Sequence, residues 1–385
     1  MSARSILRDL VAFDTSTQNS NLPLVHYVAN MLDRPGCTIR LSYDDSGTKA
    51  NLICAMGPVA EGGMLLSGHS DVVGVDGQAW SSDPFVLREA EGRLYGRGAC
   101  DMKAFIACCL EQMAELSPDR LHRPLYLALS YDEELGCVGV PRLIADLQQH
   151  FPLPSLAIVG EPTQMKVVSV HKGAFVMRTS FRGRAAHSSN PPAGLNAIDY
   201  AHRFLSFLFD MAAGLKELRS NSGVEPPYTT LNVGTIQGGT SLNTVASNCT
   251  LAWEFRPIPE VDGHAVCCRV ARFVDDLRRE MKAAVPDADV ITERLGTAFP
   301  LRWQPNAPVE ALIERLTGSA VIPISVPFGT DAGHFQAAGI PTVIMGPGSI
   351  EQAHQPDEWI ASRELQAASQ FLARAAGSAA ESNRS

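Results

Sequence analysis

Hydrophobic and polar positions follow two different patterns along the 385-residue chain. In residues 1–171, short apolar runs alternate with helical patterns, which predicts an α/β sheet. The candidate buried strands in this part are residues 64–66, 125–129 and 156–159. Between the first two, apolar side chains recur every three or four residues from Ile106 to Leu116, which is typical of an amphipathic helix.

Residues 172–290 have a different pattern, which predicts a small α+β layer of their own. The expected strands are 174–181, 229–236 and 249–255, and the expected helices are 196–211 and 265–281. From residue 291 the α/β pattern resumes, with one more buried strand at 341–345. We therefore expect a discontinuous first domain, residues 1–171 and 291–385, into which residues 172–290 are inserted as a lid.

Acidic residues and histidines follow the candidate strands at the points where those strands end. The residues in question are His69, Asp71, Glu133, Glu134 and Glu161. In open α/β sheets, ligands bind in the crevice at the carboxyl ends of the strands. Asp101 precedes the amphipathic helix, and His354 follows the last buried strand. Together these positions predict one site that is rich in carboxylates and imidazoles.

Carboxylates that lie this close repel one another, and divalent cations relieve that repulsion. Zinc accepts both imidazole nitrogen and carboxylate oxygen, and two ions about 3.5–4 Å apart can share a carboxylate. Asp101 is the natural bridging ligand. His69 and Glu161 would then complete the coordination of one ion, and Glu134 and His354 would complete that of the other.

Two further residues have expected roles beside the ligands. Asp71 can accept the second N–H of the His69 imidazole and fix its tautomer. Glu133 diverges from Glu134 if both lie on extended chain, and a carboxylate that does not bind metal suits general acid–base catalysis. Taken singly, each motif is more typical of a surface pair, a solvated loop or a turn. The joint arrangement at strand ends is what favours a metal site.

Residues of the inserted segment carry weaker signals. On spacing alone, His187 is more typical of a loop histidine, Asn243 of a turn and Arg256 of an exposed strand end. The glycine-containing segment 328–334 lacks the spacing of a phosphate-binding loop. These residue patterns alone assign no function.

Composition excludes several classes of protein. The chain has 32 Lys and Arg against 41 Asp and Glu, a net charge of −9. It has no basic stripe that would neutralise phosphates, so we expect no nucleic-acid partner. No apolar stretch approaches the ~20 residues that span a bilayer, so we expect no membrane partner. The nine cysteines include no C-x-x-C pair, which favours reduced thiols and a cytoplasmic protein.

Four ordered motifs resemble the dinuclear zinc aminoacylase and carboxypeptidase family. They are GHSDVV at 68–73, GRGACDMK at 96–103, DEE at 132–134 and GEPT at 160–163. Three further stretches resemble the members that deacetylate acetylornithine: HSSNP at 187–191 with GLNAI at 194–198, PYTTLNVG at 227–234, and GPGSI at 346–350 with QAHQPDE at 352–358. The resemblance covers essentially the whole chain and implies a zinc-peptidase-like catalytic domain with a mixed sheet and an inserted α+β lid and dimerisation domain.

The resemblance also implies roles for individual residues. It implies two zinc ions, or cobalt, held by the ligand set above, with Glu133 as the base. It changes the interpretation of His187, whose counterpart reaches the active site of the partner subunit and stabilises an oxyanion, so a homodimer through the lid is implied. Asn243 and Arg256 match substrate-binding positions, and Arg256 would bind a carboxylate bidentately. Asp331 could attract a cationic substrate tail. Cys100 and Cys137 depart from the small or polar residues that are usual in the family.

The expected function is hydrolysis of an N-acyl amino acid, with N2-acetyl-L-ornithine as the expected substrate. The nearest alternatives are N-acetylcitrulline, N-succinyl-diaminopimelate and a C-terminal glutamate. A non-catalytic binding module on a decayed peptidase fold is disfavoured by the intact set of ligands and by Glu133. A structural zinc protein is disfavoured because structural sites prefer thiolates.

Overall fold

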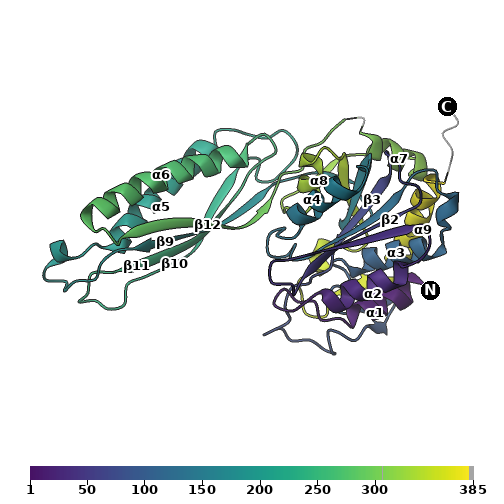
Figure 1. Cartoon of the computed structure of the whole chain (residues 1–385), viewed down its shortest axis with the longest axis horizontal. Coiled ribbons are helices and arrows are strands. Elements are labelled where there is room, and N and C mark those ends of the chain that lie inside the picture. The colour runs from purple at the N-terminus through teal and green to yellow at the C-terminus, as the bar shows by residue number, and fades with distance from the viewer. Residues whose placement is uncertain (306, 381–385) are drawn as a thin grey trace. The chain divides into compact units, whose positions relative to one another are not determined.

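The computed structural model describes residues 1–305 and 307–380, which form two units (Figure 1). The first unit comprises Met1–Ser169, Arg302–Ile324 and residues from Thr330 onward. The second comprises Val170–Leu301 and Ser325–Gly329. Each unit has a hydrophobic core of its own.

An eight-stranded mixed sheet of order β1-β2-β6-β3-β7-β14-β8-β13 belongs mainly to the first unit, and its last two strands, β8 and β13, each include residues of both units. Its strands are β1 (Cys37–Tyr43), β2 (Ala50–Met56), β3 (Met64–His69), β6 (Leu125–Ser130), β7 (Leu156–Pro162), β8 (Val168–His171), β13 (Ile324–Val326) and β14 (Thr342–Gly346). The central strands β6, β3, β7 and β14 are parallel, whereas β1, β2 and β8 pair antiparallel. The predicted α/β fold with a mixed sheet is confirmed.

Helices cover both faces of this sheet, which is why β3, β6 and β7 are buried along their whole length. Helices α4 and α8 lie on one face, and α1, α2, α3 and α9 on the other (Figure 1). The helices of the unit are α1 (Ala3–Val11), α2 (Leu22–Leu32), α3 (Lys103–Glu115), α4 (Val140–His150), α7 (Pro308–Thr317), α8 (Ala332–Ala337) and α9 (Ser362–Ser378). Short 3₁₀ turns are at Pro118–Arg120 and Ile350–Gln352.

Helix α3 differs from its prediction as an amphipathic helix. Every residue from Lys103 to Leu110 is buried, because α3 packs against α1 and α9 as well as against β3 and β7. A small three-stranded sheet, β15-β5-β4, lies in the same unit. Its strands are β4 (Arg88–Ala90), β5 (Arg93–Tyr95) and β15 (Trp359–Ala361), and β5 leads into the turn that carries Asp101.

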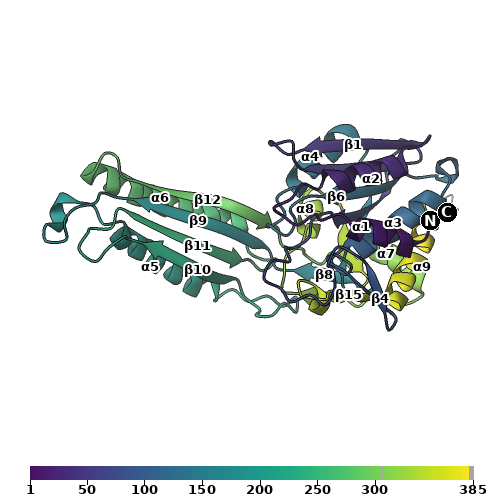
Figure 2. The ribbon, with the colours of Figure 1, turned by 90° about the horizontal axis from the view of Figure 1, so that it is seen from below.

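The second unit is a four-stranded antiparallel sheet of order β10-β11-β9-β12 with two helices on one face (Figure 2). Its elements are β9 (Ala174–Arg182), α5 (Ala197–Leu215), β10 (Thr230–Gly238), β11 (Asn248–Arg256), α6 (Gly263–Ala284) and β12 (Asp289–Ala298), with a 3₁₀ turn at Pro191–Ala193. Phe175, Phe204, Trp253 and Phe255 form the aromatic centre of its core.

The second unit is longer than the sequence pattern indicated. The α/β pattern was expected to resume at residue 291, but β12 pairs antiparallel with β9 and belongs to the sheet of the second unit. Most positions of β12 are exposed or half-exposed and include Glu293 and Arg294, so its sequence lacks a clear apolar alternation. Residues Ser325–Gly329 also join this unit, which no local pattern indicated.

Candidate active site

The carboxyl ends of the central parallel strands carry the candidate residues. His69 is the last residue of β3, and Glu161 lies near the end of β7. β6 ends at Ser130, and the turn that follows it carries Glu133 and Glu134. Because β6, β3 and β7 are adjacent and parallel, these side chains meet at one edge of the sheet.

Asp101 lies between two imidazoles. Its Oδ1 is 2.9 Å from Nε2 of His69, and its Oδ2 is 3.2 Å from Nε2 of His354. Nε2 of His69 is also 4.0 Å from Oε1 of Glu161, and Nε2 of His354 is 3.0 Å from Oε1 of Glu134. The structure therefore brings together the five residues that the sequence analysis expected as metal ligands, with Asp101 at their centre.

Two groups of donor atoms that are compact enough for metal binding share His69. Donor atoms of His69, Asp101 and Glu134 lie within 4.8 Å of one another, and so do those of His69, Glu133 and Glu161. Glu133, which was expected to act as a base and not as a metal ligand, thus lies next to the expected ligands. Imidazole nitrogen and carboxylate oxygen are donors that zinc and related divalent cations accept.

The electrostatics of this cluster also fit a bound cation. Burial, and then the charge of Asp101, raises the pKa of Glu161 well above its usual value and raises the pKa of Glu134. Hydrogen bonds with Asp101 and Glu134 raise the pKa of His354 to about 10. Burial opposes ionisation of Asp101, yet hydrogen bonds with both histidines hold its pKa below its usual range. A divalent cation would supply the positive charge that so many buried carboxylates need.

Asp71 supports the cluster differently from the prediction. Nδ1 of His69 is 2.9 Å from the backbone carbonyl oxygen of Asp71, whereas the Asp71 carboxylate is 3.7 Å away. A carbonyl oxygen can only accept, so this contact places the proton of a neutral His69 ring on Nδ1. The Asp71 carboxylate instead accepts the backbone N–H groups of Glu133 and Glu134, at 3.2 and 3.1 Å. The expected contact is thus wrong in its atom: the imidazole lies against the carbonyl oxygen of Asp71, and the carboxylate holds the turn.

Glu133 and Glu134 diverge, but not because they lie on extended chain. Glu133 lies in a tight turn, where its carbonyl oxygen accepts the N–H groups of Gly136 and Cys137. Its carboxylate accepts the thiol of Cys137 at 3.5 Å. Burial, and then the charge of Glu161, raises the pKa of Glu133 well above its usual value.

Asp331 lies close to Glu133. Its side chain is 2% exposed, and its Oδ2 accepts the hydroxyl of Ser130 at 2.6 Å. Donor atoms of Glu133, Cys137 and Asp331 lie within 4.8 Å of one another. The predicted contact of Asp331 with a cationic substrate tail stays a prediction.

His187 and Asn243 lie on neighbouring exposed loops of the second unit. Residues 187 and 244 form an antiparallel bridge, and the carbonyl of Asn243 accepts the N–H of Ser188 at 3.0 Å. Nδ1 of His187 accepts the backbone N–H of Ser189 at 3.1 Å. A neutral His187 ring therefore carries its proton on Nε2, where it can act as a hydrogen-bond donor.

Arg256, at the end of β11, is held by Glu254. Nε and Nη2 of Arg256 donate to the two carboxylate oxygens of Glu254, at 2.9 and 3.2 Å. Arg256 also lines a small cavity of about 200 Å³ within the second unit. The other residues that line this cavity are Lys172, Glu225, Pro226, Thr230, Pro327 and Phe328. The lining thus contains two cations, Lys172 and Arg256, and one acidic residue, Glu225.

Two buried charged residues were not singled out as functional from the sequence. Arg97 and Glu358 are each 1% exposed, and Nη1 of Arg97 is 2.6 Å from Oε2 of Glu358. The sequence signal that could have indicated them is their distance from the expected ligands, because Arg97 precedes Asp101 by four residues and Glu358 follows His354 by four. A local pattern does not reveal that both side chains are buried against each other.

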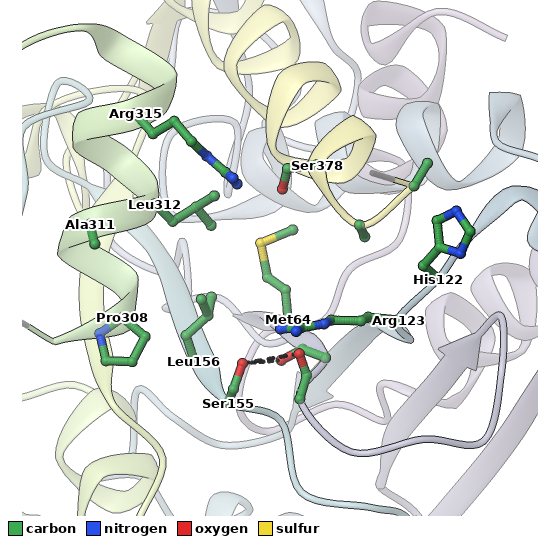
Figure 3. A pocket seen from close by; sticks show the side chains of 14 residues that line it. Met64, His122, Arg123, Ser155, Leu156, Pro308, Ala311, Leu312, Arg315 and Ser378 are labelled. Carbon is green, nitrogen blue, oxygen red and sulfur yellow. Dashed lines mark hydrogen bonds between the residues drawn. The ribbon is translucent and has the colours of Figure 1, made fainter. Parts of the chain in front are cut away.

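A larger cavity, of about 910 Å³, lies at the opposite end of the sheet (Figure 3). Its lining includes Met64 and Leu156, which are the first residues of β3 and β7, whereas the candidate residues lie at the other ends of these strands. Arg123 and Arg315 also line it, and none of its described lining residues is acidic. This cavity is therefore separate from the cluster of carboxylates and imidazoles at the strand ends.

Buried carboxylates and the imidazoles of His69 and His354 meet at the strand ends of a mixed α/β sheet, and their donor atoms fit a metal centre. A family model described as peptidase family M20/M25/M40 matches residues 65–378. The chain belongs to this family.

No helix within the described ranges 1–305 and 307–380 combines the length and the apolar character needed to cross a membrane.

Relatives with similar sequences are named acetylornithine deacetylases. The protein of Myxococcus xanthus is 36% identical over 377 residues, which cover 97% of this chain and 96% of the relative. The protein of Proteus mirabilis (strain HI4320) is 35% identical, over 91% of this chain and 88% of the relative.

Solved structures support the fold. A metallo-carboxypeptidase of the M20 family from Sulfolobus solfataricus has a TM-score of 0.71 at 19% identity, over 97% of this chain and 98% of that chain. A dinuclear metal-binding peptidase of the M20 family from Bacillus subtilis has a TM-score of 0.62 at 15% identity, over 99% and 98% of the two chains.

Proposed function

We propose that the protein hydrolyses the amide bond of N2-acetyl-L-ornithine and releases L-ornithine and acetate. The reaction type is carried by one observation, the position of Asp101 between His69 and His354 with Glu133 close by. The choice of substrate is supported by the acetylornithine deacetylases, to which the chain is 31–36% identical over 88–96% of their length.

Two zinc ions are the proposed cofactor, with cobalt as the alternative. His69 and Glu161 would hold one ion, Glu134 and His354 would hold the other, and Asp101 would contact both. When bound, zinc polarises an acyl carbonyl and lowers the pKa of water to ~7.

Glu133 carries the proton in this proposal. The water molecule that attacks the acyl carbon loses a proton to the Glu133 carboxylate as the new C–O bond forms. The same carboxyl group then donates this proton to the amine nitrogen as the C–N bond breaks. Burial and the charge of Glu161 raise the pKa of Glu133, which suits a group that has to hold a proton between the two steps.

Residues of the second unit would complete the substrate site. Nε2 of His187 would donate to the oxyanion that develops on the acyl group. Arg256 would bind the carboxylate of the amino acid bidentately, and Asn243 would add a polar contact. We expect a homodimer formed through this unit, in which each protomer supplies His187 to the active site of the other. The nine free thiols of the chain support the cytoplasm as its compartment.

The experiment that tests this function is a substrate panel with the zinc-loaded protein. Amine release would be measured from N2-acetyl-L-ornithine, N-acetyl-L-citrulline, N-succinyl-diaminopimelate and a dipeptide with C-terminal glutamate, each with and without a chelator. We expect the acetylornithine reaction to have the highest kcat/KM and to stop when the metal is removed. A preference for another member of the panel would contradict the substrate, and chelator-resistant turnover would contradict the metal-dependent mechanism.

A further inference from the structure

Arg97 joins two segments that carry expected metal ligands. Its guanidinium group is buried and donates from Nη1 to Oε2 of Glu358 at 2.6 Å and from Nη2 to Oε1 of Gln78 at 2.7 Å. The ring of Trp80 lies 5.1 Å from its Cζ. Because the guanidinium group is planar and rigid, it fixes the directions of both acceptors at once.

Glu358 holds the turn that carries Asp101. Besides Arg97, its carboxylate accepts three backbone N–H groups, from Gly98 at 3.0 Å, Cys100 at 2.8 Å and Asp101 at 3.0 Å. Three donors within four residues leave the turn little freedom to shift relative to Glu358. The carboxylate of Asp101 is therefore directed by a residue that lies 257 positions later in the chain.

Gln78 holds the backbone of His354. Its Nε2 donates to the carbonyl oxygen of His354 at 3.1 Å. Its Oε1 accepts from both Arg97 and Trp80, at 2.7 and 3.0 Å, so the amide can face His354 only with its NH₂ group. His354 has a φ of 61°, in the left-handed region that favours glycine, and the bond from Gln78 stabilises this conformation.

We propose that Gln78, Arg97 and Glu358 are positioning residues that hold Asp101 and His354 at the separation required to share one metal ion. Oδ2 of Asp101 and Nε2 of His354 lie 3.2 Å apart, although their segments are far apart in sequence. Residues that contact the metal ligands without binding the ion orient these ligands, and they commonly determine how tightly the ion is bound. This inference rests on the proposed metal-dependent function.

The Gln78→Glu variant separates the two contacts of Gln78. Glutamate keeps an oxygen that accepts from Arg97 and Trp80, and it replaces the NH₂ donor to His354 by a second oxygen. Zinc affinity would be measured by competition with a coloured chelator, and the cobalt-loaded protein would be examined by its visible absorption. We expect zinc to bind about 10–100-fold more weakly, with an altered cobalt spectrum and an unchanged Tm of the metal-free protein.

Ser81→Ala is the matched control. Ser81 is exposed and bonds to Asp357, which follows His354 by three residues, so the control alters the same two segments without touching Arg97 or His354. We expect Ser81→Ala to bind zinc like the wild type.

Two outcomes would overturn the inference. One is wild-type zinc affinity in Gln78→Glu, and the other is an equal loss of affinity in Ser81→Ala. A wild-type protein that binds no zinc and hydrolyses no member of the substrate panel would instead contradict the proposed function, so the two failures are distinguishable.

Discussion

The two units hold their candidate residues in opposite ways. In the first unit, His69, Asp101 and Glu161 are buried and are held by elements far apart in the sequence. In the second unit, His187 and Asn243 are exposed, and their side chains bond to serines two residues away. The first arrangement is organised before any ligand arrives, whereas the second leaves its side chains available to a ligand. Substitutions in the two units should therefore have different effects on metal binding and on catalysis.

The largest expected effect is that of Asp101→Ala. Both imidazoles lose the carboxylate between them, so metal binding should weaken by more than the roughly 10–100-fold that follows loss of a supporting contact. Turnover should fall to the level of the chelated wild type. Metal analysis after dialysis checks this prediction, and a variant that keeps both its metal and its turnover would contradict the central place of Asp101.

Glu133→Gln separates catalysis from metal binding in the first unit. The amide keeps the shape of the side chain but cannot accept the proton, so kcat should fall about 10²–10⁴-fold with metal content unchanged. Steady-state kinetics and metal analysis on one sample measure both quantities. Loss of the metal together with activity would make Glu133 a ligand instead of the base.

His187→Ala should lower kcat about 10²–10³-fold, as loss of an oxyanion donor does, without loss of metal or stability. His202→Ala, another exposed histidine of the same unit, is the control and should be silent.

Mixing the His187→Ala and Glu133→Gln proteins sharpens this test. If each protomer supplies His187 to the other, a mixed dimer contains one intact site, and activity should reappear. No recovery in a mixture shown to form mixed dimers would mean that His187 acts within its own chain.

Arg256→Lys should raise KM about 10–100-fold and leave kcat largely unchanged. Lysine keeps the charge but loses the paired hydrogen bonds to a carboxylate, and bonds to charged groups contribute about 1.5–3 kcal/mol. The control is Arg203→Lys, since Arg203 makes the same kind of pair with Glu280 on the surface of this unit. An equal change in KM for both variants would contradict a role of Arg256 in binding substrate.

The smallest expected effect is the dependence of metal affinity on pH. In the metal-free protein the pKa of His354 is raised to about 10, so its imidazole is protonated at neutral pH and the metal has to displace that proton. Affinity should therefore fall as pH falls, about tenfold per pH unit for each proton displaced. Calorimetric titrations in two buffers of different ionisation enthalpy would reveal the released protons, and equal heats in both would contradict the prediction.

The candidate site was predictable to the extent that it depends on strand ends. Apolar runs that lead into His69, Glu133, Glu134 and Glu161 indicate the edge of a parallel sheet, and the structure brings these residues together. The atom of Asp71 that contacts His69 was not predictable, because a carbonyl and a carboxylate of one residue compete for the same imidazole. The strand β12 was missed because its exposed polar positions obscure the alternation.

The sequence by itself determined the α/β class, the family and the set of residues that could hold a metal, because these depend on local periodicity and on motifs that are contiguous in the chain. The tertiary structure alone decided how the ligands are held. Glu358 accepts N–H groups from a turn 257–260 residues earlier, and Gln78 bonds to a carbonyl 276 residues later. Burial of Arg97 between them is likewise a property of the folded chain. Contacts at such separations depend on the packing of elements against one another, which local periodicity does not specify.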